Sequence, residues 1–178
     1  MVEVVLRKKL FGLAVVAGLG LSVTAAAAGG SPGSYSRPGI WSGLYGGLSL
    51  GRVDSGNDDG IVGGVQLGYN WQNYNIVYGV EGDIGVSNSD RIDSLGSVRG
   101  RLGYLLQPNL LVYGTAGLGF VNANESDTGF VWGVGIENKF TDTMSGRVEF
   151  LQFSNDGVHG DDVNVIRAGL NFKLGIGR

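Results

Sequence analysis

The side chains of this sequence that could do chemistry are charged residues recurring at every second position within short stretches. Glu81 and Asp83 form one such pair, and Arg99 and Arg101 form another. Residues two apart on a β-strand point to the same face of a sheet, so each pair would project to one side. The set holds four acids and six bases: Glu81, Asp83, Arg99, Arg101, Glu137, Lys139, Arg147, Glu149, Arg167 and Lys173. This near balance indicates ion pairing.

Two interpretations of this charged set differ in the role it would have. In the favoured one, the side chains form a buried network that fills the inside of a small barrel, because about eight strands enclose only enough room for side chains. In the other, they line a narrow polar pathway for ions. A wide aqueous channel is not expected, since it needs around 16 strands.

Catalysis finds little support in the residues. The single histidine, His159, has Ser154 and Asp161 near it in the chain, but nothing in their spacing marks an acyl-transfer site. The sequence has no cysteine, which excludes thiol redox and thiolate–metal chemistry. We therefore predict that the protein is not an enzyme and has no catalytic residues.

Metal and cofactor sites are not predicted either. One acidic segment, DSGNDDG from Asp54, resembles part of a calcium-binding turn, but it occurs once and acidic turn residues are usually solvated. Glycine clusters such as GGLSLG lie inside an expected strand with no helix after them, so they are not phosphate-binding loops.

The elements that must position the charged residues are β-strands. Apolar and polar residues alternate, as where Tyr78 and Val80 fall on the opposite parity to Glu81, and glycine recurs too often for helices. Eight strands are expected, an even number of segments long enough to cross a membrane when tilted. Their expected ranges are 41–51, 60–72, 75–87, 92–106, 109–122, 128–140, 143–154 and 162–174.

The connections between these strands are expected to alternate in length. Tight turns are predicted at 73–74, 107–108 and 141–142, whereas the other four connections are longer and more polar. Outer-membrane barrels have short periplasmic turns and long outer loops. With a periplasmic amino terminus, the segments RVDSGNDDG, SNSDR, NANESDT and SNDGVHGDD would face outward.

Closure into a barrel would leave no unpaired sheet edge. The resulting prediction is an all-β fold, an eight-stranded antiparallel transmembrane β-barrel. A soluble ligand-binding barrel shows the same alternation with its faces reversed, so it remains an alternative. The glycine-rich polar parity, the nearly balanced charges and aromatic residues near strand ends favour the membrane version. These aromatics are Trp41, Tyr45, Tyr69, Trp71, Tyr104, Phe140 and Phe172.

The amino-terminal residues 1–28 read as a cleavable signal peptide, with basic residues, an apolar run and then small residues. Residues 29–40 are expected to be a flexible periplasmic segment, 41–174 the barrel and 175–178 a carboxyl-terminal extension. Removing the signal changes the net charge from −3 to about −5. This acidic excess argues against binding nucleic acid, whose phosphates require a basic face.

Several stretches resemble one known family. WSGLYGGLSLG at 41, GVEGDIGVS at 79, VRGRLGYLL at 98, LLVYGTAGLGF at 110 and KFTDTMSGRVEFL at 139 follow one another in the order found in opacity-protein-like surface antigens, also called porin-family outer-membrane β-barrel proteins. The resemblance covers essentially the whole chain after the signal. It implies an eight-stranded membrane barrel with surface loops.

The last expected strand looks like the signal that the barrel-assembly machinery reads in this family. The matching residues are Arg167, Gly169, Phe172 and Leu174. The family generally ends on an aromatic residue, whereas this chain has Leu174 there and continues to Arg178. The departure bears on the efficiency of insertion and not on the fold.

The sequence therefore predicts a structural protein of the cell outer membrane that contributes to envelope integrity and presents loops to a host or the environment. Its expected partners are outer-membrane lipid, lipopolysaccharide, the barrel-assembly machinery and a possible host or surface ligand bound by the loops. A small-solute porin with a narrow polar lumen is the first alternative, and a soluble ligand-binding barrel is the second.

Overall fold

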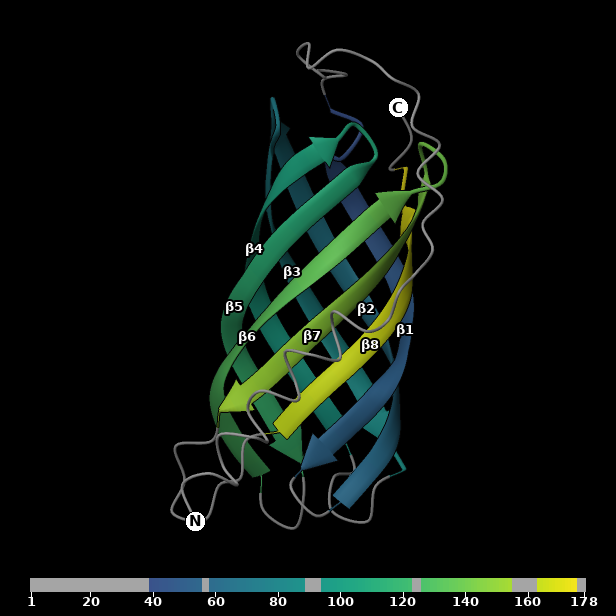
Figure 1. The fold of residues 1–178 in the computed structure, drawn as a ribbon. Helices are drawn as coiled ribbons and strands as arrows, with labels where there is room; N and C mark the ends of the chain where they lie inside the picture. The colour runs from purple at the N-terminus through teal and green to yellow at the C-terminus, as the bar shows by residue number, and fades with distance from the viewer. Residues whose placement is uncertain (1–38, 56–57, 89–93, 123–125, 155–162, 176–178) are drawn as a thin grey trace, which may run out of the picture. The chain divides into compact units, whose positions relative to one another are not determined.

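A computed structural model shows one closed antiparallel barrel of eight strands in which each strand pairs with its neighbours in sequence and β8 closes on β1 (Figure 1). The structure describes residues 39–55, 58–88, 94–122, 126–154 and 163–175. The expected signal peptide and most of the segment 29–40 lie outside these ranges. The strands are β1 (Gly43–Ser55), β2 (Asp58–Asn73), β3 (Ile76–Ser87), β4 (Ser94–Gln107), β5 (Leu110–Asn122), β6 (Ser126–Lys139), β7 (Met144–Ser154) and β8 (Val163–Lys173).

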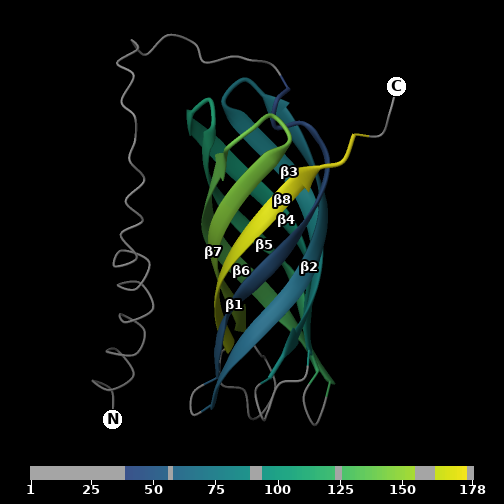
Figure 2. The same ribbon diagram turned by 90° about the vertical axis from the view of Figure 1, so that its right-hand side faces the viewer.

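The register of the strands fixes which side chains share the inside of the barrel. Along β7 buried and partly exposed residues alternate at every position, as a period of two requires. The seam runs from Tyr45, which pairs with Lys173, to Asp54, which pairs with Asn164, and Figure 2 shows β8 lying beside β1 there. Closure therefore pairs every strand on both sides.

The first hairpin is longer than expected. The prediction ended the first strand at Gly51 and began the second at Gly60, but pairing continues through Asp54 and Asp59 to the end of the hairpin. Val53 explains the extension, because its side chain is only 1% exposed and points into the lumen. The expected loop RVDSGNDDG is therefore mostly strand, and only residues 56–57 connect β1 to β2.

The two ends of the barrel differ in their connections. We call the end with the turns 74–75, 108–109 and 140–143 the turn end, and the opposite end the loop end. The turns lie close to the predicted positions. At the loop end the connections 88–93 and 155–162 are longer, but those after β1 and β5 span only two and three residues. The prediction of four long loops is therefore wrong for these two.

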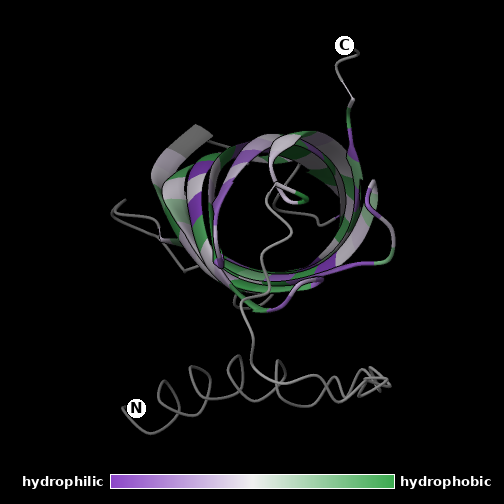
Figure 3. Ribbon diagram, turned by 90° about the horizontal axis from the view of Figure 1, so that it is seen from above, coloured by the Kyte–Doolittle hydropathy of each residue, from purple (hydrophilic) through white to green (hydrophobic). Residues whose placement is uncertain are grey.

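The outer surface of the barrel is apolar along its length. Large exposed side chains include Leu48 on β1, Ile84 on β3 and Leu102 on β4, the last of which is 63% exposed. Viewed from above, the strands form a ring in which hydrophobic and hydrophilic residues alternate (Figure 3). An apolar outside around a charged inside is the reverse of a soluble ligand-binding barrel, so that alternative is wrong.

Two aromatic residues expected at the membrane boundary lie inside the barrel. Trp41 is 4% exposed and Tyr45 is 6% exposed, because Trp41 folds into the turn end and Tyr45 has the inward parity of β1. The other five expected residues are outward. Near the turn end, Trp71 lies 4.6 Å from Tyr69 and 5.7 Å from Tyr78 between ring centroids.

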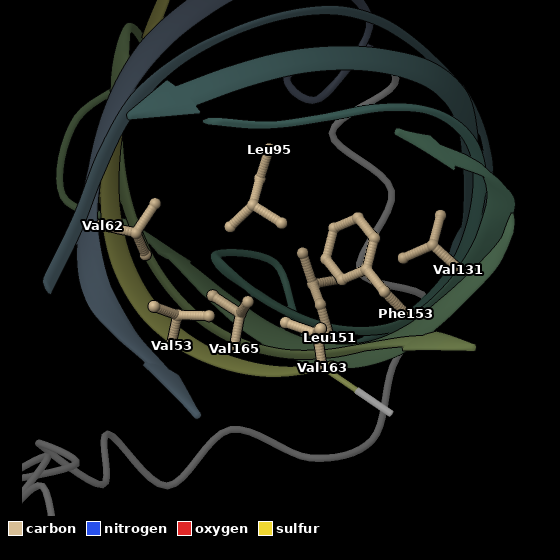
Figure 4. Packing of buried hydrophobic residues seen from close by; sticks show 8 residues of the cluster. All are labelled: Val53, Val62, Leu95, Val131, Leu151, Phe153, Val163 and Val165. Carbon is tan, nitrogen blue, oxygen red and sulfur yellow. The ribbon is translucent and has the colours of Figure 1, made fainter. Parts of the chain in front are cut away.

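Apolar side chains fill both ends of the lumen. At the turn end, Trp41, Val77, Leu105, Leu111 and Tyr113 form one buried cluster. Near the loop end a second cluster projects into the lumen from β1, β2, β4, β6, β7 and β8 (Figure 4). It consists of Val53, Val62, Leu95, Val131, Leu151, Phe153, Val163 and Val165. Along β4, Arg99 and Arg101 lie between Leu95 of the loop-end cluster and Leu105 of the turn-end cluster.

Candidate functional site

Glu81 of β3 is a hub of the ion pairs inside the barrel. Its Oε1 lies 2.7 Å from Nη2 of Arg99, and its Oε2 lies 2.5 Å from Nη1 of Arg147. The hydroxyl of Tyr45 also donates to Oε2 at 2.6 Å. Glu81 therefore joins β1, β3, β4 and β7 through a single buried carboxylate.

Arg167 of β8 bridges two further carboxylates. Its Nη1 lies 2.9 Å from Asp83 of β3, and its Nη2 lies 2.7 Å from Glu149 of β7. The guanidinium of Arg99 contacts the same two acids, at 2.9 Å from Asp83 and 3.3 Å from Glu149. Two arginines thus share two acids across the lumen.

Glu137 and Arg101 form the part of the network nearer to the turn end. Arg101 donates to Glu137 at 2.7 Å, and Glu137 also accepts hydrogen bonds from the Ser145 hydroxyl and the Asn171 amide. Arg101 reaches the hub through Tyr45, whose hydroxyl oxygen accepts its Nη1–H at 3.1 Å. One continuous network therefore holds Glu81, Asp83, Arg99, Arg101, Glu137, Arg147, Glu149 and Arg167.

Two tyrosines in this network lie over glycines on neighbouring strands. The ring of Tyr45 occupies the space that a Cβ at Gly68 would need, and the ring of Tyr113 occupies the space beside Gly135. The Tyr113 hydroxyl donates to Glu149 at 3.1 Å, and its ring lies 4.1 Å from the Arg101 guanidinium carbon. Glycine at these inward positions is what lets a small barrel hold large aromatic and charged side chains together.

Two of the ten residues predicted for the lumen lie apart from the network. Lys139 and Lys173 end β6 and β8 at the turn end, where both are half-buried. In the described part of the chain no carboxylate forms an ion pair with either ammonium group. Both side chains were predicted to point into the lumen. Both residues lie at the last position of their strand, however, beyond the level of the charged network.

Several partners in the network were not among the predicted residues. Tyr45, Tyr113, Ser97, Ser145 and Asn171 hydrogen-bond to the buried carboxylates. Ser97, Ser145 and Asn171 share the parity of the charged residues on their own strands, whereas β1 and β5 carry no charged residue on the parity of Tyr45 and Tyr113. The predicted network included only charged residues, and for Tyr45 and Tyr113 the alternation on their own strands offers no charged residue as a guide.

Four acids balance four arginines in a region that is almost closed to water. Arg99 is 1% exposed, and both the apolar clusters and the ion pairs shield it. Burial of charge costs free energy that the ion pairs and hydrogen bonds only offset, so the removal of one partner costs about 3–5 kcal/mol. The network therefore holds the strands at one spacing.

Little free space remains around these charges. Two small cavities of about 20 Å³ each border the network, one beside Asp83 and Arg167 and one beside Glu137 and Lys139. A volume of this size holds about one water molecule. At these two places the described lumen leaves room for about one water molecule each.

The remaining predicted sites cannot be assembled from the described residues. Ser154 ends β7, but His159 and Asp161 lie outside the described ranges, as do most side chains of the DSGNDDG segment. Within those ranges, no group of three or more acidic or histidine side chains could hold a metal ion. In the same ranges no helix is long and apolar enough to cross a membrane.

The residues predicted to form an assembly signal are divided between the two faces of β8. Arg167 and Gly169 face the lumen, where Gly169 approaches the Leu48 carbonyl, whereas Phe172 and Leu174 are exposed on the outside. Recognition by the assembly machinery stays a prediction.

Comparison with known proteins gives the family of this barrel. Residues 11–173 match the outer membrane protein beta-barrel domain. A 22 kDa outer membrane protein of Rhizobium leguminosarum is 39% identical over 134 residues, which are 63% of this chain and 63% of that protein. A 25 kDa outer-membrane immunogenic protein of Brucella ovis is 35% identical over 162 residues, which are 75% of this chain and 78% of that protein.

Solved structures share the fold at low sequence identity. A designed transmembrane β-barrel matches with a TM-score of 0.52 and 21% identity, over 78% of this chain and 98% of that one. The attachment invasion locus protein of Yersinia pestis matches with a TM-score of 0.50 and 18% identity, over 75% of this chain and 97% of that one. The closed barrel has a charged inside and an apolar outside, in agreement with the family match. The chain therefore belongs to the outer membrane protein beta-barrel domain family and is a protein of the outer membrane.

Proposed function

We propose that this protein is a structural component of the outer membrane, a closed barrel that strengthens the envelope and holds surface loops in place. The observation that carries the proposal is the filling of the lumen. Four arginines and four acids pair between an apolar cluster at each end. A network of this kind stiffens a barrel and leaves little room for solute, which suits support better than transport.

The loops would supply recognition. Outer-membrane barrels place their longer connections outside the cell, and on this ground we propose that the loop end faces the surface. The Brucella relative is named as an immunogenic outer-membrane protein. We therefore expect the loop-end connections to meet lipopolysaccharide and a host or environmental ligand, and the apolar outside to contact membrane lipid.

A structural protein should be needed for envelope strength and should lack an enzymatic reaction of its own. Deletion of the gene should increase entry of a fluorescent hydrophobic dye and sensitivity to detergent, and the wild-type gene should restore both. The matched variant is a strain in which Arg101→Met replaces the wild-type protein. This variant lacks one partner of a buried ion pair, but the outer surface of its barrel is unchanged. Normal dye exclusion in the deletion strain, with the protein demonstrably present in the parent, would overturn the envelope role.

Conductance separates this function from the small-solute porin. The purified protein inserted in a planar bilayer should give no reproducible current steps, because packed side chains fill the described part of the lumen. The same sample would be run on a gel with and without boiling. A difference in migration between the two would confirm that the protein in the bilayer sample is folded, because boiling unfolds the barrel. Reproducible unitary conductance from inserted protein would establish the porin instead.

A further inference from the structure

The apolar band around the outside of the barrel is not equally tall on all strands. On β2, β3 and β5 the outward positions are apolar or glycine along 61–71, 76–86 and 110–120. Each of these runs covers about 11 residues, which is enough for a tilted strand to cross the hydrocarbon of a membrane. On β1 and β7 the corresponding runs, 44–50 and 144–150, cover only about 7 residues and fall short of that length.

Polar side chains end the band early on three adjacent strands, β7, β8 and β1, which lie side by side at the seam (Figure 2). Gln152 on β7, Asn164 on β8 and Arg52 on β1 each occupy the outward position that follows the last apolar one. Asn164 pairs with both Gln152 and Asp54, so these three residues form one row across the outer wall. We call the outer face formed by Arg52, Asp54, Gln152 and Asn164 the polar notch.

The strands on either side of the polar notch stay apolar. Arg52 pairs with Ile61 of β2, and Gln152 pairs with Trp132 of β6. Phe130, the next outward residue of β6 toward the loop end, is also apolar and is 50% exposed. The polar notch is therefore a local interruption of the apolar surface.

The register of the strands gives the level of each residue along the barrel axis. Following the paired residues from Gly43 around all eight strands leads back to β1 at Val53, ten residues closer to the loop end. This offset tilts the strands by about 40° from the axis. One residue along a strand then advances about 2.5 Å along the axis, and one step to the next strand along a row advances about 3 Å.

On this scale the polar notch lies within the apolar band of the other strands. The last apolar residues of β1, β7 and β8 toward the loop end lie about 3–6 Å below the level of Arg52. Those of β2, β3, β5 and β6 lie about 1–3 Å beyond that level. These four exposed residues are Ile61, Val86, Phe120 and Phe130.

The turn end of the band is level by comparison. Leu174, which follows β8, and Ile76 of β3 are both exposed and lie within about 1 Å of each other along the axis. Met144 of β7 lies within about 3 Å of both. Since a tilt of the whole barrel would displace one side at both ends, tilt does not match a band that is short at one end only. The bilayer itself must adapt at the loop end.

We infer that the polar notch draws the headgroups and water of the loop-end leaflet inward by about 5 Å beside β7, β8 and β1, so that the barrel thins the membrane on one side. Hydrocarbon would strip the water from an arginine and two amides, whereas a bilayer shortens by a few ångströms at modest cost. Lipid headgroups therefore occupy this face. The inference needs the outer-membrane location of the barrel and does not depend on the envelope role.

The depth of spin labels on the two sides of the barrel tests the inference, and the absence of cysteine from the chain allows single labels. Ile166→Cys on β8 and Ile84→Cys on β3 form a matched pair, because both replace an outward isoleucine at nearly the same level. In the folded full-length chain in phosphatidylcholine nanodiscs, the accessibility of each nitroxide to oxygen and to a water-soluble nickel chelate reports its depth. We expect the label at position 166 to lie about 5 Å closer to water than the label at position 84.

A second matched pair separates thinning from tilt. Leu170→Cys on β8 and Val80→Cys on β3 share a level nearer to the turn end. Thinning of the loop-end leaflet should leave these two labels at equal depth. A tilt would displace both labels on β8 in the same direction relative to the labels on β3, and this result would overturn the inference.

Filling the polar notch tests the cause of the thinning. Gln152→Leu combined with Asn164→Leu extends the apolar band and should bring the label at position 166 to the depth of the label at position 84. Asn164→Leu alone should move it part of the way. Asn138→Leu, which replaces an outward amide of β6 at the turn end, is the control and should leave the difference unchanged. Heat-dependent gel migration would confirm that each variant is folded.

Two outcomes in the otherwise wild-type chain would contradict the inference. Equal depths at positions 166 and 84 would show that the membrane has the same thickness on both sides. Labels at position 166 that are shielded from both reagents, and that broaden each other's spectra, would show that a second copy of the chain covers this face in place of lipid.

Discussion

The buried pair of Arg101 and Glu137 allows the energetic role of the network to be measured. Both side chains are nearly inaccessible, and their closest N–O distance is 2.7 Å. Arg101→Met leaves the Glu137 carboxylate with two neutral donors, Ser145 and Asn171. We expect this variant to lose about 3–5 kcal/mol of the free energy of unfolding, because a buried charge remains without its counter-ion.

A second change should recover much of that loss. In Arg101→Met/Glu137→Gln neither side chain carries a charge, and the new amide keeps an acceptor for Ser145 and Asn171. We expect the double variant to be more stable than the sum of the two single effects implies by about 2–3 kcal/mol. Additivity of the single effects would show that the charges do not interact across the lumen.

The assay is reversible unfolding in lipid vesicles by urea, followed by tryptophan fluorescence and by the fraction of protein that migrates as the folded form on unboiled gels. Asn109→Ala serves as the control, because it removes one exposed hydrogen bond, to Asn138, and should cost only about 0.5–1.5 kcal/mol. A single-variant loss within the control's range would refute the proposed contribution of the ion pair.

Four further changes test other features of the barrel. Tyr45→Phe removes a hydroxyl that donates to Glu81 and should cost about 1–3 kcal/mol in the same vesicle assay. Gly68→Ala places a methyl group in the Tyr45 ring and should lower the yield of folded protein on unboiled gels, whereas Gly82→Ala, whose nearest atom would be 3.7 Å away, should leave the yield unchanged. Leu102→Arg puts a charge on the apolar outside near the middle of β4 and should cost about 2–4 kcal/mol in urea unfolding, unless that surface is solvated. Leu174→Phe restores the terminal aromatic residue of the family and should speed insertion, measured as folded protein against time with purified assembly machinery; equal rates would argue against a signal at this position.

Most of the barrel could be predicted from the period of two, because the inside and outside of a membrane barrel differ strongly in polarity. The parity of Glu81, Arg99 and Glu149 predicted that their side chains would face one another. Tyr45 was misplaced because an aromatic residue near a strand end suits both a membrane boundary and a lumen. Its partner Gly68 decides between them, and that pairing depends on the strand register.

The ends of the strands were harder to predict for a different reason. Aspartate is common in turns, but Asp54 and Asp59 pair as strand residues because Val53 anchors the hairpin inside the lumen. The residue types of this segment do not reveal that Val53 is buried in the lumen. Lys139 and Lys173 show the same limit, because alternation gives the face of a residue but not its depth along the barrel.

The seam between β1 and β8 has a mechanical consequence. Besides its contact with Glu149 on the neighbouring strand β7, Arg167 crosses the lumen to Asp83 on β3. A force that separates β8 from β1 must therefore stretch the contact between Arg167 and Asp83 as well as the backbone hydrogen bonds between the two strands. Because the last strand, β8, is joined across the lumen to β3, the barrel wall resists both opening between β8 and β1 and flattening under the lateral pressure of the membrane.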